Sequence, residues 1–229
     1  MRLRLIYKGF LSYGVRWPLG KVVVAFLSLV SPVMADEPVT VLALGDSLTQ
    51  GYGLPEQDGL VPQMQKWLED QGVEARLINA GVSGDTTAGG AARVEWSLTP
   101  EVDAMIVALG GNDLLRGIDP AVSRGNLEAI LQVAEAKGVE VLLVGLKAPG
   151  NYGADYKTSF DAIYPDLSEA YGAILASDFF AGLGGGDPAA LQEWFQADGI
   201  HPNAKGVARI VDGLGPQVRA LVEAARATE

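Results

Sequence analysis

The stretch VTVLALG, residues 39–45, is a continuous apolar run that ends in glycine. Runs of this length, rich in β-branched residues and bounded by glycine, are typical of strands that are buried on both faces. Four further stretches share the pattern: ARLINAG (75–81), AMIVALGG (104–111), EVLLVGL (140–146) and GAILASDFF (172–180). They predict five strands of one sheet that is covered on both sides.

Helical patterns lie between these strands, at 60–71, 86–98, 122–137 and 156–171, and a last helix follows His201. Pro216 falls inside this last helix and is expected to bend it or split it in two. Strands that alternate with helices at roughly 30-residue spacing predict an α/β protein with a parallel sheet between two helical layers. Ligands bind beyond the carboxyl ends of the strands in such sheets, so the loops that follow the strands are the places to look for a site.

The first 35 residues indicate a secretory leader. They carry five basic residues, namely Arg2, Arg4, Lys8, Arg16 and Lys21, and no acid before Asp36. An uncharged stretch of 14 residues, 22–35, follows and ends in small residues. This order is typical of a signal peptide, and the stretch is short for the roughly 20 residues of a membrane helix. We expect cleavage after Ala35, a single domain over residues 36–229, no stable membrane span, and a periplasmic or secreted protein; an uncleaved anchor is the alternative.

The charge and the cysteine count exclude several functions. The chain has 17 basic and 28 acidic residues, and without the leader 12 basic residues remain against the same 28 acids, a net charge of about −16. Nucleic-acid binding requires a basic patch that neutralises phosphates, so no nucleic-acid partner is expected. The absence of cysteine excludes disulfides, a thiolate nucleophile and a cysteine-based zinc site. Export without disulfides fits a bacterial periplasm or exterior.

The loop GDSLTQGYG, residues 45–53, follows the first predicted strand. It places Ser47 at the end of a strand and behind a glycine, where a nucleophile would lie. The loop is not the G-x-S-x-G elbow of another hydrolase class, because Leu48 and Thr49 follow the serine. A helix cap is an equally good interpretation of Ser47 from this loop alone.

Two further loops carry weaker signals. In NAGVSGDTT, residues 79–87, Gly81 and Gly84 allow tight turns and close approach to a ligand, although the loop is by itself only a glycine-bearing connection. In LGGNDLLRG, residues 109–117, Asn112 offers side-chain N–H donors that suit an oxyanion. The alternative for Asn112 is an Asn-Asp turn that bonds its own backbone.

The loop DGIHPNAKG, residues 198–206, contains the only histidine of the chain, His201. Serine needs an adjacent base to act as a nucleophile, and imidazole is the side chain suited to that role near neutral pH. Asp198, three residues earlier, is placed to orient the ring. A purely structural role for His201 stays open, and a metal site is poorly supported by one histidine and no cysteine.

Together, these loops resemble the conserved blocks of the SGNH (GDSL) hydrolase family. The matching blocks are GDSL at 45–48, NAGVSGD at 79–85, GGND at 110–113 and DGIHP at 198–202, and the likeness spans about residues 39–225. The segment 148–172 is similar to a branch of bacterial periplasmic acyl-CoA thioesterases, arylesterases and lysophospholipases. Gly81 departs from that branch, which often has serine there, and the oxyanion glycine of the family matches Gly84.

The resemblance implies a flavodoxin-like three-layer α/β/α sandwich with a five-stranded parallel sheet. It also implies an esterase that cleaves acyl esters and thioesters through an acyl-enzyme intermediate, without a metal or organic cofactor. Ser47 would be the nucleophile, His201 the base and Asp198 its orienting partner. The oxyanion hole would consist of the backbone N–H groups of Ser47 and Gly84 and the side-chain amide of Asn112.

The substrate is less well defined by the sequence. We expect Leu114 and Leu115 to line an acyl pocket and Tyr152, within 148–153, to lie at its rim, although the two leucines could instead pack beneath their loop. The expected partner is a small-molecule or lipid acyl ester, such as an aryl ester, a lysophospholipid or an acyl-CoA, and we expect a monomer. The alternatives are a carbohydrate acetylesterase, an acyltransferase and a lipid-binding pseudoenzyme.

Overall fold

The computed structural model of the protein describes Gly9, Gly14 and residues 37–184 and 191–228. The predicted signal peptide, residues 1–35, therefore lies outside the described part except for these two glycines. Within the described ranges, no helix combines the length and the apolar character needed to cross a membrane.

The core of the fold is a five-stranded sheet in which every pair of neighbouring strands is parallel. The strands are β1 (Val39–Gly45), β2 (Ala75–Gly81), β3 (Ala104–Ala108), β4 (Glu140–Val144) and β5 (Ile174–Ala176). Their order across the sheet is β2-β1-β3-β4-β5. The predicted α/β class, the five parallel strands and the flavodoxin-like order are confirmed.

The strands form where the sequence is apolar on both faces. All seven residues of β1 and all five of β3 are buried, because helices cover both sides of the sheet. Strands β3, β4 and β5 end earlier than the apolar runs predicted. After β3, for example, the chain turns at Gly110, whose φ of 119° suits glycine, and enters a short helix at Gly111.

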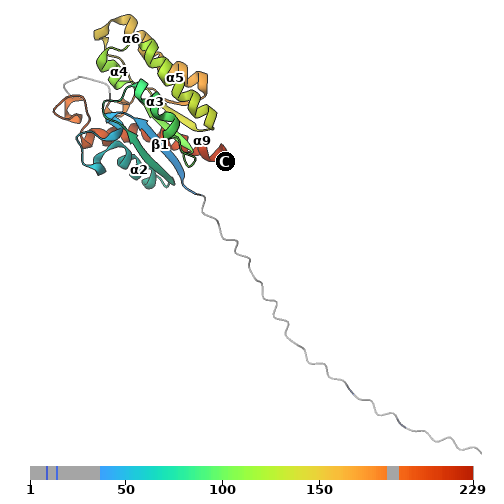
Figure 1. Cartoon of the computed structure of the whole chain (residues 1–229). Helices are drawn as coiled ribbons and strands as arrows, with labels where there is room; N and C mark the ends of the chain where they lie inside the picture. Colours follow the sequence, from blue (N-terminus) through green and yellow to red (C-terminus); the bar gives the residue numbers. More distant parts are fainter. Residues whose placement is uncertain (1–8, 10–13, 15–36, 185–190, 229) are drawn as a thin grey trace, which may run out of the picture. The chain divides into compact units, whose positions relative to one another are not determined.

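Helices flank the sheet on both sides (Figure 1). They are α1 (Ser47–Gln50), α2 (Leu60–Asp70), α3 (Thr87–Ser97), α4 (Gly111–Arg116), α5 (Pro120–Lys137), α6 (Ala154–Asp161), α7 (Ile163–Tyr171) and α9 (Ala204–Thr228). Short 3₁₀ turns occur at Glu56–Asp58, Gly150–Tyr152, Ala181–Leu183 and Gln192–Trp194. Helices α2 and α9 pack together on one face, whereas α3, α5 and α7 form the layer on the other.

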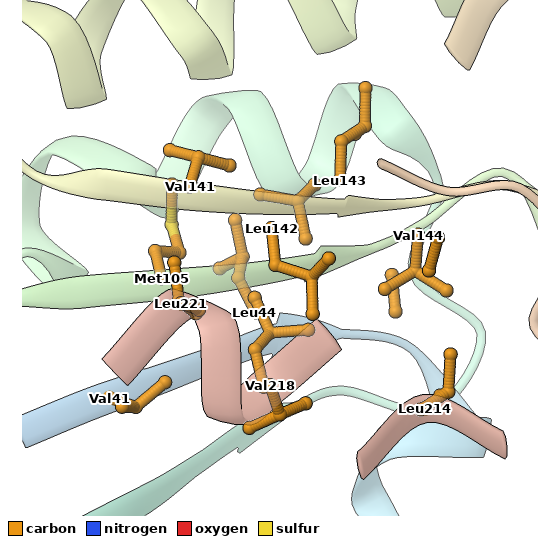
Figure 2. Close-up of a cluster of buried hydrophobic side chains, with 14 of the residues drawn as sticks. Val41, Leu44, Met105, Val141, Leu142, Leu143, Val144, Leu214, Val218 and Leu221 are labelled. Atoms are coloured by element: carbon orange, nitrogen blue, oxygen red, sulfur yellow. The ribbon is translucent and has the colours of Figure 1, made fainter. Parts of the chain in front are cut away.

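Figure 2 shows that the side chains of β4 alternate between the two helical layers. Leu142 of β4 points toward α9, where Val218 and Leu221 meet it, whereas Val141 and Leu143 point to the opposite side. All five side chains are buried. This two-residue alternation explains why β4 is apolar at successive positions, with a helical layer on each side.

The single helix predicted over residues 156–171 is wrong, because the structure has two helices there, α6 and α7, with Ala162 between them. Pro165 accounts for the break. A proline has no N–H for the residue four positions earlier, and it is favoured in the first turn of a helix, where no such partner is needed. The chain therefore begins a new helix at Ile163, which places Pro165 in the first turn of α7.

Of the two outcomes expected at Pro216, a bend or a split, the split does not occur, since α9 continues through it from Ala204 to Thr228. Pro216 and Asp212, four residues earlier, are both exposed. The carbonyl that loses its helical partner therefore belongs to the solvent side of the helix, where water can hydrate it. The opposite side of α9 stays packed on the sheet through Leu214 and Val218.

The strand order places a crevice at the carboxyl ends of the strands. From β1 the chain moves outward to the edge strand β2, then returns to β3 on the other side of β1. The loops that follow β1 and β3 therefore diverge, and a crevice opens outside the carboxyl ends of these strands. Ser47 follows β1 directly and Asn112 follows β3, so the fold brings both to this crevice.

Candidate active site

A cleft of about 720 Å³ lies at this edge of the sheet. The loops after β1, β2, β3 and β4 and the loop before α9 line it. Seven of the eight predicted site residues are among its lining: Ser47, Gly84, Asn112, Leu114, Leu115, Tyr152 and His201. The eighth, Asp198, contacts His201 from outside this lining.

A continuous chain of hydrogen bonds joins Ser47, His201 and Asp198. His201 Nδ1 lies 2.6 Å from Asp198 Oδ2, and His201 Nε2 lies 2.9 Å from Ser47 Oγ. An ionised carboxylate only accepts hydrogen bonds, so Nδ1 carries the proton and donates to Asp198. In a neutral ring Nε2 is then the acceptor, and it receives the hydrogen bond of the Ser47 hydroxyl.

Asp198 is held in its ionised form by the loop that carries His201. The backbone N–H of His201 (3.0 Å) and that of Ile200 (2.9 Å) both donate to Asp198 Oδ1. The backbone N–H of His201 is the largest cause of a lowered pKa, followed by the imidazole and the N–H of Ile200, and together they bring the pKa of Asp198 to about 2. The carboxylate is therefore ionised at neutral pH and accepts the hydrogen bond from Nδ1.

Ser47 occupies the first position of α1, directly behind the strand. The cap of this helix is Asp46, whose side chain accepts from the backbone N–H of Leu48, so the alternative that Ser47 serves as the cap is wrong. The Ser47 hydroxyl is free to bond His201 instead. No acceptor for the backbone N–H of Ser47 occurs in the part of the chain that the structure describes.

Gly84 and Asn112 lie in the cleft on either side of the β1 loop. Gly84 has a φ of 81°, a left-handed conformation that favours glycine, and its backbone N–H has no acceptor among the described residues. Arg116 donates to the Gly84 carbonyl at 2.9 Å. The Asn112 amide donates to Asp46 Oδ2 at 3.2 Å rather than to its own backbone, so the alternative of a self-bonded Asn-Asp turn is wrong.

Two residues of the 79–87 loop, Asp85 and Thr86, have structural roles. Thr86 caps α3 by accepting from the backbone N–H of Gly89. Asp85 forms an ion pair with Arg93 at 2.8 Å, and Arg93 also donates to the carbonyls of Ala80 and Gly45. This arginine therefore joins the ends of β1 and β2 beneath the cleft.

Asp46 lies within the GDSL block at 45–48, but the sequence alone assigns it no role. The side chain is 2% exposed, and burial is the largest cause of a pKa raised from the ordinary 3.8 to about 6. Hydrogen bonds from Leu48 and Asn112 partly oppose this rise. An acid directly before the candidate nucleophile was visible in the sequence, but its partner, 66 positions away, was not.

The raised pKa predicts a pH-dependent cost to stability. Because the folded state holds the proton more tightly than the unfolded state, the contribution of Asp46 to the free energy of unfolding falls as the pH rises from about 4 to above 6. The free energy of unfolding of an Asp46→Asn variant, measured relative to that of the parent, should therefore rise by up to about 3 kcal/mol between the low and the high end of that pH interval. Urea denaturation of both proteins at pH 4 and pH 7 measures this, and a constant difference between them would contradict it.

The predicted substrate-binding residues line the cleft as expected. Leu115 is 60% exposed, so it does not simply pack beneath its loop, and Tyr152 is 43% exposed at the rim. Leu114 is partly buried and also packs against the core. Sequence reasoning missed other lining residues, among them Lys147, Phe180, Phe195 and Ile200.

Two contacts hold the His201 loop against the β1 loop. The ring of Tyr52 lies over the imidazole, with ring centroids 4.5 Å apart. The side-chain amide of Gln196 donates to the carbonyls of Tyr52 (2.8 Å) and Pro202 (3.0 Å). These contacts set the distance between the loop that carries Ser47 and the loop that carries His201.

A resident metal ion has no set of ligands here. No group of three or more histidine, aspartate or glutamate side chains is arranged to hold one within residues 37–184 and 191–228. The polar groups that line the cleft include N–H donors, a hydroxyl and an imidazole, which are groups used for acyl transfer.

Comparison with known proteins identifies the family to which this sheet and its cleft belong. A sequence model of the family described as "GDSL-like Lipase/Acylhydrolase family" matches residues 43–209. Esterase TesA of Pseudomonas aeruginosa is 40% identical over 184 residues, which cover 80% of this chain and 89% of that protein. Thioesterase 1/protease 1/lysophospholipase L1 of Escherichia coli K12 is 36% identical over 185 residues, 80% of this chain and 85% of that one.

A solved structure gives the same result. The crystal structure of AlinE4, an SGNH-hydrolase family esterase, is 41% identical and superposes with a TM-score of 0.67, over 80% of this chain and 96% of that one. The chain belongs to the GDSL-like lipase/acylhydrolase family, and it is an ester and thioester hydrolase of that family.

Proposed function

We propose that the protein hydrolyses acyl esters and thioesters through an acyl-enzyme intermediate on Ser47. The observation that carries the proposal is the 2.9 Å hydrogen bond between Ser47 Oγ and the only imidazole of the chain, which in turn bonds Asp198. A serine needs such a base to attack a carbonyl carbon at neutral pH. The bond lies in the cleft at the carboxyl ends of the strands, whose lining is mostly apolar, so an acyl group has room to bind.

In the first half of the reaction, Ser47 Oγ attacks the acyl carbon and its proton passes to His201 Nε2. The tetrahedral intermediate then collapses, the bond to the alcohol or thiol breaks, and the leaving group takes the proton from Nε2. In the second half, water loses a proton to Nε2, attacks the acyl-enzyme and releases the acid with regeneration of the Ser47 hydroxyl. Asp198 stabilises the imidazolium that exists between these transfers.

The developing oxyanion is stabilised by three donors in this proposal: the backbone N–H groups of Ser47 and Gly84 and the side-chain amide of Asn112. Two observations support it. Both backbone N–H groups lack an acceptor in the described ranges, and all three residues line the cleft. Donors fixed in advance in a partly water-excluded site are the main source of such stabilisation.

An Asn112→Ala variant should lose at least about tenfold in kcat, and as much as 10²–10³-fold if the amide is a full oxyanion donor. The reason is that one hydrogen bond to the charged intermediate is removed while Ser47 and His201 are retained. Steady-state hydrolysis of p-nitrophenyl acetate by the purified variant measures the loss. An unchanged kcat would remove Asn112 from the oxyanion hole.

The proposed substrate has an apolar acyl chain and a variable leaving group. Leu114, Leu115 and Tyr152 would contact the acyl chain, together with the aromatic side chains Phe180 and Phe195. The relatives include an esterase, a thioesterase/lysophospholipase and an arylesterase, and these names support aryl esters, lysophospholipids and thioesters as the classes to test, with an acyl-CoA as the thioester. Every proposed catalytic group comes from a single chain, in keeping with an active monomer.

A substrate screen tests this function. It would compare p-nitrophenyl esters of increasing chain length, a lysophospholipid, an acyl-CoA and an acetylated polysaccharide, with and without an added alcohol acceptor. Turnover of the first three classes supports the proposal, exclusive turnover of the polysaccharide supports a carbohydrate acetylesterase, and transfer to the alcohol supports an acyltransferase. Binding without turnover of any substrate would support a lipid-binding pseudoenzyme.

We further propose that residues 1–35 direct export and are removed, so that the hydrolase acts in the periplasm or outside the cell. The support is the order of basic, apolar and small residues in this segment.

A further inference from the structure

Asp46 lies between the candidate nucleophile and the candidate oxyanion amide. Its side chain is almost fully buried at the end of β1. Each carboxylate oxygen accepts one hydrogen bond: Oδ1 from the backbone N–H of Leu48 at 3.0 Å, and Oδ2 from Asn112 Nδ2 at 3.2 Å. No cation forms an ion pair with this carboxylate among the residues described. The side chain thus joins α1, which begins at Ser47, to α4, which carries Asn112.

We propose that Asp46 is a positioning residue that determines which end of the Asn112 amide is available to the reacting carbonyl. The inference rests on the proposed function, in which this amide stabilises the oxyanion.

The argument depends on the shape of the amide group. Its NH₂ end and its carbonyl end are nearly equal in size, so packing alone selects poorly between the two orientations of Asn112. An ionised carboxylate accepts hydrogen bonds and cannot donate one. The orientation that turns the amide oxygen toward Asp46 would therefore place two acceptors against each other. With Asp46 ionised, the nitrogen is held at the site, and its second N–H remains for the oxyanion.

The carboxylate itself has little freedom to move. Oδ1 is fixed by its hydrogen bond to the first turn of α1. A Cβ added at Gly111, the residue before Asn112, would lie 3.2 Å from Asp46 Oδ2, so the backbone of α4 approaches the carboxylate closely. The short side chain of aspartate spans this gap between the two helices.

The charges around Asp46 allow it to be ionised under working conditions. A positive charge on His201 lowers the pKa of Asp46, whereas Asp85 raises it. Asp85 is neutralised by its ion pair with Arg93. On the other side, the hydroxyl of buried Tyr164 donates to the Leu109 carbonyl rather than to this acid. Above about pH 6 the carboxylate can therefore orient Asn112 in the way proposed.

Replacement of Asp46 by asparagine is the sharpest test, because it keeps the shape and removes the acceptor-only character. One end of the new amide would face Leu48 N–H and the other Asn112 Nδ2. Since one end is itself a donor, one of the two hydrogen bonds must be lost or Asn112 must turn over. We expect kcat for p-nitrophenyl acetate at pH 8 to fall by about tenfold or more, as for the loss of an oxyanion donor, with little change in KM.

A double-mutant cycle separates positioning from general structural damage. If Asp46 acts through Asn112, then Asp46→Asn introduced into Asn112→Ala should reduce kcat by less than about threefold further. Asp103→Asn is the matched control. Like Asp46, Asp103 accepts a hydrogen bond from a backbone N–H, in this case that of Thr40 at 2.7 Å. Thr40 lies near the start of β1, whereas Asp46 follows the end of this strand. This variant should retain the parent kcat.

Two results would overturn the proposal. One is a parent-like kcat in Asp46→Asn. The other is a fold-loss of kcat in the double variant that equals the product of the fold-losses in the two single variants. A parent protein that hydrolyses no ester would instead refute the proposed function. In that case a second measurement, which does not require turnover, tests the role of Asp46.

That measurement is the ¹⁵N–¹H signal of the Asn112 side-chain amide in a His201→Ala background, assigned by its loss in a further Asn112→Ala variant. Removing His201 excludes its own titration and takes away a charge that lowers the pKa of Asp46. The signal should move with a midpoint near or somewhat above pH 6. A signal that stays fixed between pH 5 and pH 8 would show that the amide does not respond to Asp46 and would overturn the proposal, even if Asp46→Asn fails to fold.

Discussion

Replacing Ser47 with alanine should reduce kcat for p-nitrophenyl acetate by about 10⁴-fold or more, a loss typical of a removed nucleophile. Without the hydroxyl no acyl-enzyme can form, and the oxyanion donors and the cleft can only assist direct attack by water. The same variant should no longer react with a fluorophosphonate probe. Steady-state kinetics and the intact mass of the probe-treated protein measure the two effects.

Ser97→Ala is the matched control for this variant. The Ser97 hydroxyl donates to the Arg93 carbonyl at the end of α3 that is remote from the cleft, so its loss should leave both rate and labelling unchanged. A Ser47→Ala protein that still gained the mass of the probe would place the nucleophile at another residue.

Replacing His201 with alanine should have an effect of similar size, about 10⁴-fold or more in kcat. Ser47 would keep its hydroxyl but lose its only base, because His201 is the only imidazole in the chain and its Nε2 is the partner of Ser47 Oγ. Deprotonation would then depend on hydroxide from the solvent, so the remaining activity should rise steadily with pH. Rates between pH 6 and pH 10 measure this.

The unfolding midpoint of the His201→Ala protein is the control for general damage, and it should stay close to that of the parent. Imidazole added to the buffer should restore part of the activity, since the variant leaves a space in front of Ser47 and beneath Tyr52. A folded variant with near-parent kcat would show that the base lies elsewhere.

The parallel sheet was predictable because its signal is local. Each strand is buried on both faces, so residues such as those of β1 form uninterrupted apolar runs that can be recognised without knowledge of their neighbours. Strand ends were less predictable, because an apolar run continues past the last paired residue. In β4, for instance, the strand ends at Val144, although Leu146 is still apolar and buried.

The two prolines illustrate where local reasoning failed. Pro165 and Pro216 look alike in the sequence, yet the chain begins a new helix around Pro165 and continues its helix through Pro216. The difference depends on which way the unpaired carbonyl faces and on what the rest of the helix packs against. Neither can be read before the tertiary structure is known.

The candidate site was predictable to the extent that its residues stand in recognisable blocks. Ser47, Gly84, Asn112, Asp198 and His201 were identified in this way, and their catalytic roles remain predictions that the proposed experiments test. Side chains that matter through long-range contacts were not recognised. Asp46, for example, needs Asn112 to have a function, and the two come together only when β1 and β3 are paired.

The bond between Ser47 and His201 joins residues that are 154 positions apart in the chain. His201 lies just before α9, and this helix packs on α2 and on the sheet, so its docking brings the imidazole to the hydroxyl. If the two residues act as proposed, a molecule in which α9 has not docked contains a serine without its base. The reaction of Ser47 with a fluorophosphonate probe would then report that α9 is in place.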